Sequence, residues 1–311
     1  MSEEGLSRVE MKADTLSAEV LPQLGGKISS LRYKGAELLQ APLREYGPRT
    51  LDMDFADSDA SGIDECLPTV APSEIPGPSG KVMIPDHGEF WRLPCDVEVA
   101  GEREIRLAAQ GFMLPLRLER RLTLDESTLR IDYRLENLGE TEIPYLWSAH
   151  PLFVVEEGDI VVLPDSVTQL TVENSIHDRL GLKGEKVSWP WVSLVDGRKM
   201  DISRAEDAEE NVGDKLWCGA PREGWAELER RHAGLRVRVG FDGNQTPYLG
   251  LWLCYGGWPE GQTKRQQCVA IEPCTAPGDS LAEALTKGWA QMLAPGQSVI
   301  WWMTIAVSEI S

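Results

Sequence analysis

The sequence predicts an all-β protein of 311 residues, built from many short antiparallel strands. Apolar and polar residues alternate with a period of two in many segments, as in strands that bury one face. The chain has 29 Gly and 20 Pro, and turn residues separate these segments at short intervals. No strand–helix alternation spans the chain, which argues against a doubly wound α/β fold.

The clearest alternation lies in the segment LRIDYRLEN, residues 129–137. Its apolar side chains Leu129, Ile131, Tyr133 and Leu135 share one face, and charged side chains occupy the other. Residues 235–241, LRVRVGF, follow the same pattern. Further strands are expected at Thr15–Val20, Lys27–Tyr33, Glu104–Gln110, Leu116–Thr123, Tyr248–Tyr255, Cys268–Glu272 and Ser298–Val307.

Helical signals are few. Residues 203–206 and 280–283 both read Ser-x-x-Glu, the capping box in which Ser caps a helix and Glu reaches back, so each predicts a short helix. The Pro/Gly-rich stretch 71–80 is only ten residues long, and we interpret it as a surface loop. With no linker elsewhere, we expect one domain over residues 1–311.

The charge balance excludes several partners. With 31 Lys+Arg and 50 Asp+Glu, the formal net charge is −19, which repels nucleic acid and anionic membrane surfaces. No apolar run approaches the roughly 20 residues of a membrane span. We therefore expect a small-molecule partner, no nucleic acid and no membrane.

The cysteines and the remaining motifs predict neither a metal nor a cofactor. None of the six cysteines forms a CxxC or a zinc-like Cys/His spacing, so we expect reduced, mostly buried thiols. The N-terminal residues are acidic and polar, without the features of a signal peptide, and we expect a cytoplasmic protein. No nucleotide-binding glycine motif, nucleophile elbow or HExxH is present.

Two of the four histidines have contexts that suggest a site. His87 lies in PDHGEFW and His150 in PYLWSAHPLF, among aromatic residues and prolines, where a turn can hold an imidazole at a cleft. The alternative is an ordinary, hydrogen-bonded core histidine. His177 and His232 lie in strongly polar contexts.

Glu272 is the most informative carboxylate. It closes the apolar run CVAI and precedes Pro273, with few charges nearby in the sequence. Burial of this kind raises the pKa of a carboxyl group, as a general base near neutrality requires. The alternative is a strand-end glutamate that reaches solvent.

The 11 tryptophans give collective support to a carbohydrate site. Indole faces stack on the apolar faces of sugars while polar neighbours bind the hydroxyls. For any single tryptophan, ordinary packing is the competing explanation. Those in motif-like segments are Trp91, Trp147, Trp252, Trp258 and Trp289.

The acidic stretch 51–65 raises the question of a calcium site. Residues 57–62 match the opening of an EF-hand loop, but Pro68 stands where the bidentate Glu is required. We expect instead a solvated acidic loop, or a loop that places Asp64 and Glu65 at a cleft.

Taken together, these segments resemble the aldose 1-epimerase (galactose mutarotase-like) family. Each motif alone is weak, and their order and spacing carry the resemblance through nearly the whole chain. The matching pieces are LGGKISSL at 24–31, GIDECLPT at 62–69, PDHGEFW at 85–91, WSAHPLF at 147–153, DKLW at 214–217, YLGLW at 248–252, IEPCT at 271–275 and LAPG at 293–296.

The resemblance implies a large single-domain antiparallel β-sandwich with a sugar site on a concave face. It also implies catalytic roles. Glu272 matches the family's base, His150 the acid at the ring oxygen, and His87 the histidine that holds and polarises the sugar. The positions that we expect to contact substrate are Asp64, Glu65, Trp147, Lys215, Trp252 and Arg49.

Two departures from the family pattern bear on the substrate. Ala149 stands where an asparagine usually precedes the second histidine, and Pro151 follows that histidine. Ala60 and Ser61 stand where relatives active on sugar phosphates have an arginine, and Arg49 is the nearest substitute. Both departures weaken the sugar-phosphate option.

The resemblance therefore predicts a cofactor-independent aldose 1-epimerase that interconverts the anomers of a free aldose, as a monomer or homodimer. Two alternatives stay open. One is a carbohydrate-binding or sensing protein on the same fold, without catalysis. The other is an isomerase or lyase that acts on an unusual sugar.

Overall fold

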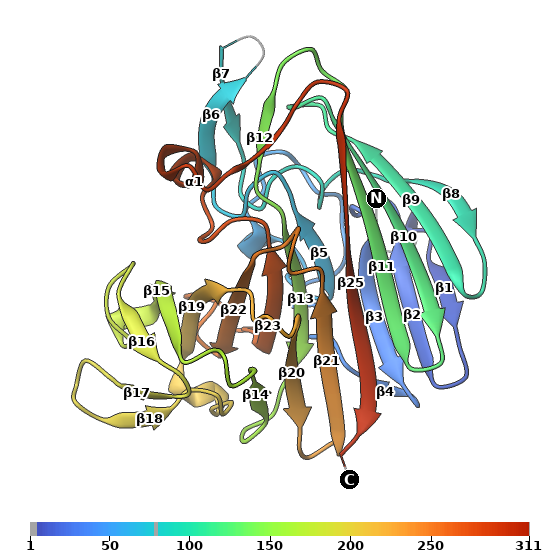
Figure 1. Cartoon of the computed structure of the whole chain (residues 1–311). Coiled ribbons are helices and arrows are strands. Elements are labelled where there is room, and N and C mark those ends of the chain that lie inside the picture. The colour runs from blue at the N-terminus through green and yellow to red at the C-terminus, as the bar shows by residue number, and fades with distance from the viewer. Residues whose placement is uncertain (1–4, 78–79, 311) are drawn as a thin grey trace.

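A computed structural model describes residues 5–77 and 80–310. Within these ranges, two large antiparallel sheets pack face to face as a β-sandwich (Figure 1). The larger sheet has eleven strands and the smaller has eight, and three two-stranded sheets lie outside them. The expected all-β sandwich is confirmed.

The element bounds are as follows. The larger sheet contains β1 (Val9–Lys12), β2 (Leu16–Leu21), β3 (Lys27–Tyr33), β4 (Ala36–Glu37), β5 (Ile63–Cys66), β13 (Ser148–Val154), β15 (Gln169–Ser175), β16 (Lys186–Ser188), β19 (Val212–Gly219), β22 (Tyr248–Tyr255) and β23 (Gln267–Cys274). The smaller contains β8 (Asp96–Ala100), β9 (Glu104–Gln110), β10 (Leu116–Asp125), β11 (Thr128–Asn137), β14 (Ile160–Val162), β20 (Trp225–Arg230), β21 (Leu235–Phe241) and β25 (Ser298–Glu309).

The remaining elements are short. Two of the two-stranded sheets are hairpins, β6 (Ser73–Gly77) with β7 (Gly80–Ile84) and β17 (Trp191–Ser193) with β18 (Lys199–Asp201). The third pairs β12 (Ile143–Tyr145) with β24 (Gln291–Leu293), which are remote in the sequence. The helices are α1 (Leu281–Lys287) and the 3₁₀ turns Phe55–Asp57, Ile176–Asp178 and Ala208–Glu210. Among the described residues, none of these helices has the length and apolarity that crossing a membrane requires.

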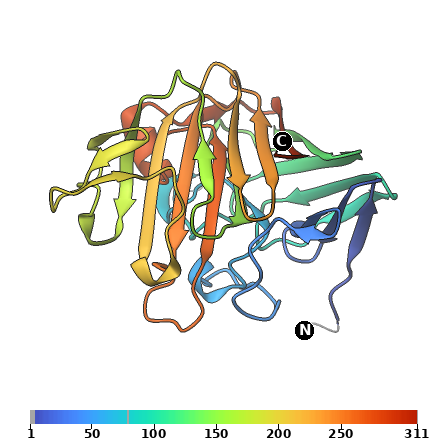
Figure 2. The ribbon, with the colours of Figure 1, turned by 90° about the horizontal axis from the view of Figure 1, so that it is seen from below.

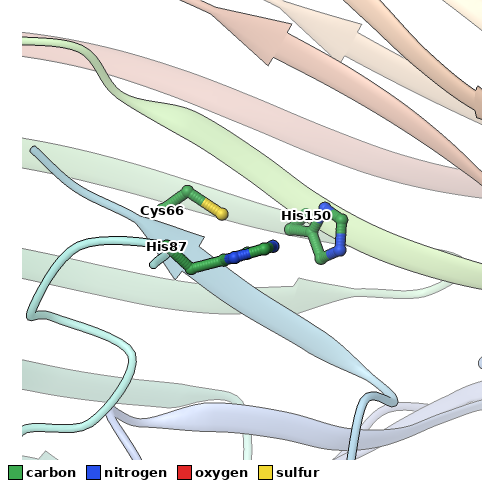
Figure 3. A group of neighbouring side chains, drawn as sticks. All are labelled: Cys66, His87 and His150. Atoms are coloured by element: carbon green, nitrogen blue, oxygen red, sulfur yellow. The ribbon is translucent and has the colours of Figure 1, made fainter. Parts of the chain in front are cut away.

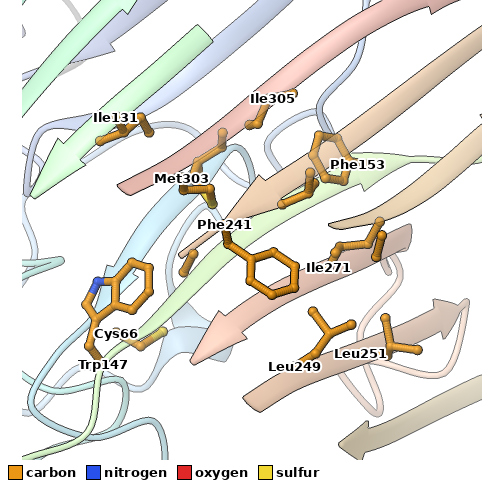
Figure 4. Close-up of a cluster of buried hydrophobic side chains, with 14 of the residues drawn as sticks. Cys66, Ile131, Trp147, Phe153, Phe241, Leu249, Leu251, Ile271, Met303 and Ile305 are labelled. Atoms are coloured by element: carbon orange, nitrogen blue, oxygen red, sulfur yellow. The ribbon is translucent and has the colours of Figure 1, made fainter. Parts of the chain in front are cut away.

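The main core lies between the two sheets (Figure 4). The apolar face of β11 and the alternate residues of β21 point inward, and they meet the inner face of β22 and β23. Phe241, at the end of β21, is 2% exposed and lies near Ile271 and Leu249 of the opposite sheet. Strand periodicity thus decides which side chains fill the sandwich.

The central strands of the larger sheet are buried on both faces. Every residue of β13 except Val154 is buried, as is every residue of β23 except Gln267. The smaller sheet covers the inner face. On the outer face, Phe55 and Trp91 from two long loops pack on Leu152 and Ala270, and Figure 2 shows the blue loop region beside the orange strands. A site between the sheet and these loops is therefore bounded by protein on two sides.

Most of the strand predictions are confirmed within two residues at each end, and β3, β9, β21 and β22 have the expected bounds. The helix predicted from the capping box at Ser280 is confirmed as α1, where Ser280 accepts a hydrogen bond from the Glu283 amide. The helix predicted at residues 203–206 is wrong. Ser203 Oγ donates instead to Asp201 Oδ1 at 2.6 Å, so the side chain closes a turn.

Residues 71–80, interpreted as a surface loop, contain strands where they are described, because β6 and the start of β7 form a hairpin there. Residues 78 and 79 lie outside the described ranges. The six cysteines are unpaired, and all but Cys95 are buried, as expected for reduced core thiols. The extent of the domain, residues 1–311, stays a prediction.

The position of Phe241 generates a stability test. Phe241→Ala should lower the free energy of unfolding by about 3–5 kcal/mol, because it removes a ring that fills the space between the sheets. Phe112→Ala is the matched control, since Phe112 is 53% exposed and should change stability little. Urea unfolding followed by circular dichroism measures both. Equal losses in the two variants would contradict the packing described for Phe241.

Candidate active site

A cavity of about 400 Å³ lies on the outer face of the larger sheet, between the strands and the two covering loops. This volume is in the range of small-ligand sites. Five of the residues singled out from the sequence line it: His87, His150, Lys215, Trp252 and Trp258. Its other lining residues include Asp54, Phe55, Asp86, Asn174, Gln266 and Asp279.

Strand register brings His150 and Glu272 together. On β13 and β23 the flanking pairs Ser148–Cys274 and Leu152–Ala270 place Glu272 directly opposite His150, on the same face. The His150 Nδ1 atom lies 3.0 Å from Glu272 Oε1. Residues far apart in the sequence thus form a cross-strand pair beneath the cavity.

Glu272 lies within β23 and is 1% exposed, so it does not end the strand or reach solvent. The Lys215 ammonium donates to Glu272 Oε2, and His150 holds Oε1. Burial alone would raise the pKa of Glu272, but the Lys215 charge and the His150 hydrogen bond lower it to about 2. The expected raised pKa of Glu272 is therefore wrong, because the compensating charge comes from β19, remote in the sequence.

Gly250 makes room for the contact between Lys215 and Glu272. It stands opposite Glu272 in the β22–β23 register, and a Cβ there would lie 3.1 Å from Glu272 Oε2. The Lys215 Nζ atom also lies 3.6 Å from Asp279 Oδ1. Burial alone would lower the pKa of Lys215, but the two carboxylates outweigh it and raise the pKa. Both Lys215 and Glu272 are therefore ionised at neutral pH.

His150 is 7% exposed and has a hydrogen bond to a carboxylate on one side only. Burial lowers the pKa of His150 below its ordinary value of 6.5, and the contact with Glu272 opposes this shift only in part. At neutral pH the imidazole is therefore mainly neutral, with Nδ1–H donating to Glu272. The other nitrogen, Nε2, is left for a ligand.

A strained turn positions His87. Its backbone φ is 57°, in the left-handed region that non-glycine residues rarely adopt, and the next residue, Gly88, has φ 71°. A Cβ on Gly88 would lie 2.0 Å from the Leu67 carbonyl oxygen, so only glycine fits at this position. Asp86 Oδ1 lies 2.9 Å from His87 Nδ1 and orients the ring.

Aromatic side chains form one wall of the cavity. Phe55 stacks on His87, with ring centroids 4.2 Å apart and planes 10° from parallel. Trp258 lies 6.1 Å from the Phe55 centroid, and Trp252 donates from Nε1 to Gln266 Oε1 at 2.9 Å. An apolar wall beside a few fixed polar groups suits the mixed surface of a sugar.

Glu65 and Trp147 are not at this cavity. Adjacent residues of a strand point to opposite faces, so Glu65 faces the interior of the sandwich while Asp64 faces outward. The Trp147 indole donates to Glu65 Oε2 at 2.8 Å, and Arg120 and Tyr133 bind Oε1. Both predicted substrate contacts are therefore buried in a polar network between the sheets.

Arg49 and Asp64 also lie away from the cavity lining. Arg49 donates to Asp59 Oδ1 at 2.7 Å and to Asp64 Oδ1 at 2.9 Å, and Lys27 lies between the same carboxylates. The expectation of a solvated loop or cleft is wrong for Asp59 and Asp64, because two cations neutralise them in the interior. The oxygens of these carboxylates are therefore already bound by cations and are not available to calcium.

Several cavity residues were not singled out from the sequence. Phe55 and Asp54 come from the acidic stretch, Gln266 precedes β23, and Asp279 precedes α1. Asp86 is adjacent to His87, and a carboxylate next to a candidate histidine was a usable signal. The others are brought to the cavity by loops whose paths the sequence does not specify.

Other hollows of similar size lack such chemistry. One of about 430 Å³ lies on the outer face of the smaller sheet and is lined by arginines and carboxylates. Arg121 and Arg106 both bind Glu104, and Arg130 binds Asp132, so its charges are paired with one another on the surface. We therefore place the candidate site at the cavity beside His150.

One group of side chains at the cavity has metal-ligand chemistry. Figure 3 shows Cys66 of β5 beside His87 and His150. One potential ligand atom from each lies within 4.8 Å of the others. Thiolate and imidazole are ligands that Zn²⁺ prefers.

The fold is that of the galactose mutarotase-like β-sandwiches. A putative aldose 1-epimerase from Escherichia coli K12 superposes with a TM-score of 0.71 at 16% identity, over 98% of this chain and 100% of that one. A galactose mutarotase related enzyme from Lactobacillus acidophilus gives 0.70 at 15% identity, over 98% of each chain. The aldose epimerase homologue from C. elegans gives 0.70 at 13% identity, over 99% and 100%.

At these identities the likeness shows the fold alone. No protein-family model matches the sequence, and no curated protein does. The expected resemblance is thus confirmed by structure, over nearly the whole length of the chain.

The buried ions near Arg49 generate a second stability test. Lys27 is fully buried between Asp59 and Asp64, so Lys27→Ala should destabilise the protein by about 3–5 kcal/mol by leaving buried carboxylates short of a partner. Lys34→Ala, on the surface just after β3, is the control and should leave the unfolding midpoint unchanged. Thermal unfolding compares them. A Lys27→Ala variant as stable as Lys34→Ala would refute a structural role for this cluster.

Proposed function

We propose that this protein is a cofactor-independent aldose 1-epimerase, which interconverts the α and β anomers of a free aldose. The observation that carries the proposal is the His150–Glu272 pair, 3.0 Å apart, beneath a sugar-sized cavity with an aromatic wall. The fold shared with structures named as aldose epimerases adds support. A protein that only binds sugar needs no such pairing of carboxylate and imidazole.

The chemistry needs one proton acceptor and one proton donor. To open the ring, a proton leaves the O1 hydroxyl and another reaches the ring oxygen O5. In our proposal Glu272 receives the O1 proton and protonated His150 donates to O5. Rotation about C1–C2 then exposes the other face of the aldehyde, and both transfers run in reverse.

The neighbouring residues hold these groups ready. Lys215 keeps Glu272 ionised, and its ammonium is placed to interact with negative charge that develops on O1. In our proposal His87, held by Asp86 and stacked on Phe55, orients the sugar. Trp252 offers an apolar face in the same cavity.

The charge of the lining favours a neutral sugar. The described lining residues include three carboxylates, on Asp54, Asp86 and Asp279, against the single ammonium of Lys215. No arginine is among them, although arginine is the residue best suited to bind phosphate. A phosphate group would therefore meet net repulsion, so we propose free aldoses as the substrate class.

The proposal predicts that Glu272→Gln abolishes anomer exchange, because the amide cannot accept the O1 proton. Saturation-transfer NMR on glucose, galactose, xylose and arabinose measures the α–β exchange rate with and without protein. Loss of one acid–base group should cost about 10²–10⁴-fold in kcat. Glucose 6-phosphate, added to the panel, should exchange more slowly than glucose.

Glu309→Gln is the control for this experiment, since Glu309 is exposed at the end of β25 and far from the cavity. It should exchange anomers at the wild-type rate. Wild-type rates in Glu272→Gln would remove Glu272 as the base. If no sugar exchanges faster than it does alone but some bind, the non-catalytic binding protein becomes the better interpretation.

The His150 environment predicts the pH dependence. The pKa of His150 is lowered by burial, so the protonated donor is scarce at neutral pH and becomes more abundant as pH falls, while Glu272, with a pKa of about 2, stays ionised. The value of kcat/KM for exchange should therefore rise as pH is lowered from about 8 to about 5.5. Circular dichroism over the same range checks that the protein stays folded.

The opposite slope would contradict this assignment. If kcat/KM falls as pH is lowered through this range while the protein stays folded, the neutral imidazole is the active form. His150 would then act as a base and not as the donor to O5.

A further inference from the structure

The group formed by Cys66, His87 and His150 is not explained by proton transfer to a sugar. Cys66 is fully buried, yet it faces the same side of the larger sheet as His150. In the β5–β13 register Cys66 pairs with Ser148 and Asp64 pairs with His150, so Cys66 and His150 are diagonal neighbours on one face. The turn at residues 85–88 brings His87 over them, as Figure 3 shows.

Each imidazole is already oriented as a metal-binding histidine is. Nδ1 of His87 contacts the Asp86 carboxylate at 2.9 Å, and Nδ1 of His150 contacts the Glu272 carboxylate at 3.0 Å. Histidines that bind metals usually have their second nitrogen held in this way. Among the described residues neither Nε2 atom has a hydrogen-bond partner, so each is available to an ion.

The separations allow an ion to bind with a small adjustment. The three potential ligand atoms lie within 4.8 Å of one another. Around a tetrahedral zinc ion, a sulfur at about 2.3 Å and a nitrogen at about 2.0–2.1 Å are roughly 3.5 Å apart. The atoms must therefore approach by on the order of 1 Å, which small side-chain rotations supply.

We propose that Cys66, His87 and His150 bind a divalent ion of the zinc class, through one thiolate and two imidazole nitrogens. The Cys66 S–H bond breaks as the sulfur–metal bond forms, and the thiol proton passes to the solvent. His87 and His150 line the cavity, so the fourth coordination position faces it and stays open to water. The ion enters through the same opening as a sugar.

The site has a consequence that rests on the proposed function. A bound ion occupies the His150 nitrogen that would protonate O5, so the ion and catalysis exclude one another. Zn²⁺ should therefore inhibit anomer exchange, and a chelator should restore it. Binding of the ion itself does not depend on whether the protein is an epimerase.

The test is a titration of the reduced, metal-free protein with Co²⁺, followed by absorbance, and then competition with Zn²⁺. Wild type should bind one Co²⁺ per chain and show a thiolate-to-cobalt charge-transfer band. Cys66→Ser should lose the band and weaken Zn²⁺ binding by at least about tenfold. Cys268→Ser, an equally buried thiol on β23 outside the group, should keep both.

The outcomes are separable. Absence of the band in wild type, or its persistence in Cys66→Ser, would overturn the metal site, and the wild-type spectrum decides this even if a variant fails to fold. Metal binding without any exchange activity would reject the epimerase and leave the site standing. The third outcome supports both the metal site and the epimerase. In it, Zn²⁺ inhibits anomer exchange in wild type and in Cys268→Ser, but inhibits Cys66→Ser far less when each rate is compared with that variant's own metal-free rate.

Discussion

A buried carboxylate constrains the whole site. Glu272 is enclosed by the central strands of the larger sheet, and an ionised group there requires compensating charge. His150 on the neighbouring strand β13 and Lys215 on β19, which lies beyond β22, supply it. Gly250 leaves space beside Glu272 where a Cβ would lie 3.1 Å from Oε2, and Asp279 lies 3.6 Å from the same ammonium. Residues from four strands and one loop thus surround the buried charge of Glu272.

The same alternation that made the fold predictable misplaced part of the site. Strand ranges such as Lys27–Tyr33 follow from local periodicity, whereas His150 and Lys215 were expected at the site because their motifs resemble those of the aldose 1-epimerase family. The adjacent residues Asp64 and Glu65 were both expected to contact substrate, although a strand directs their side chains to opposite faces. The face of the strand that points to the cavity is decided by where the second sheet packs, and the local sequence does not specify that packing.

Contacts between residues far apart in the sequence were the other features that could not be predicted. The sequence has no zinc-like spacing of Cys and His. His87 lies 21 residues after Cys66, and His150 lies 63 residues after His87, so the three side chains meet only through sheet register and a turn. The low pKa of Glu272 has the same origin, because Lys215 is 57 residues away. Residue type and neighbours along the chain therefore identified candidate groups but not their charge states.

A proline follows each member of the His150–Glu272 pair. Pro151 follows His150 on β13, and Pro273 follows Glu272 on β23, so neither position has an amide hydrogen for the ladder. Between the pairs Ser148–Cys274 and Leu152–Ala270 the β13–β23 register is interrupted. The most enclosed part of the sheet therefore has fewer amide donors than an ordinary ladder, and in the proposed mechanism it holds the two side chains that would exchange protons with the sugar.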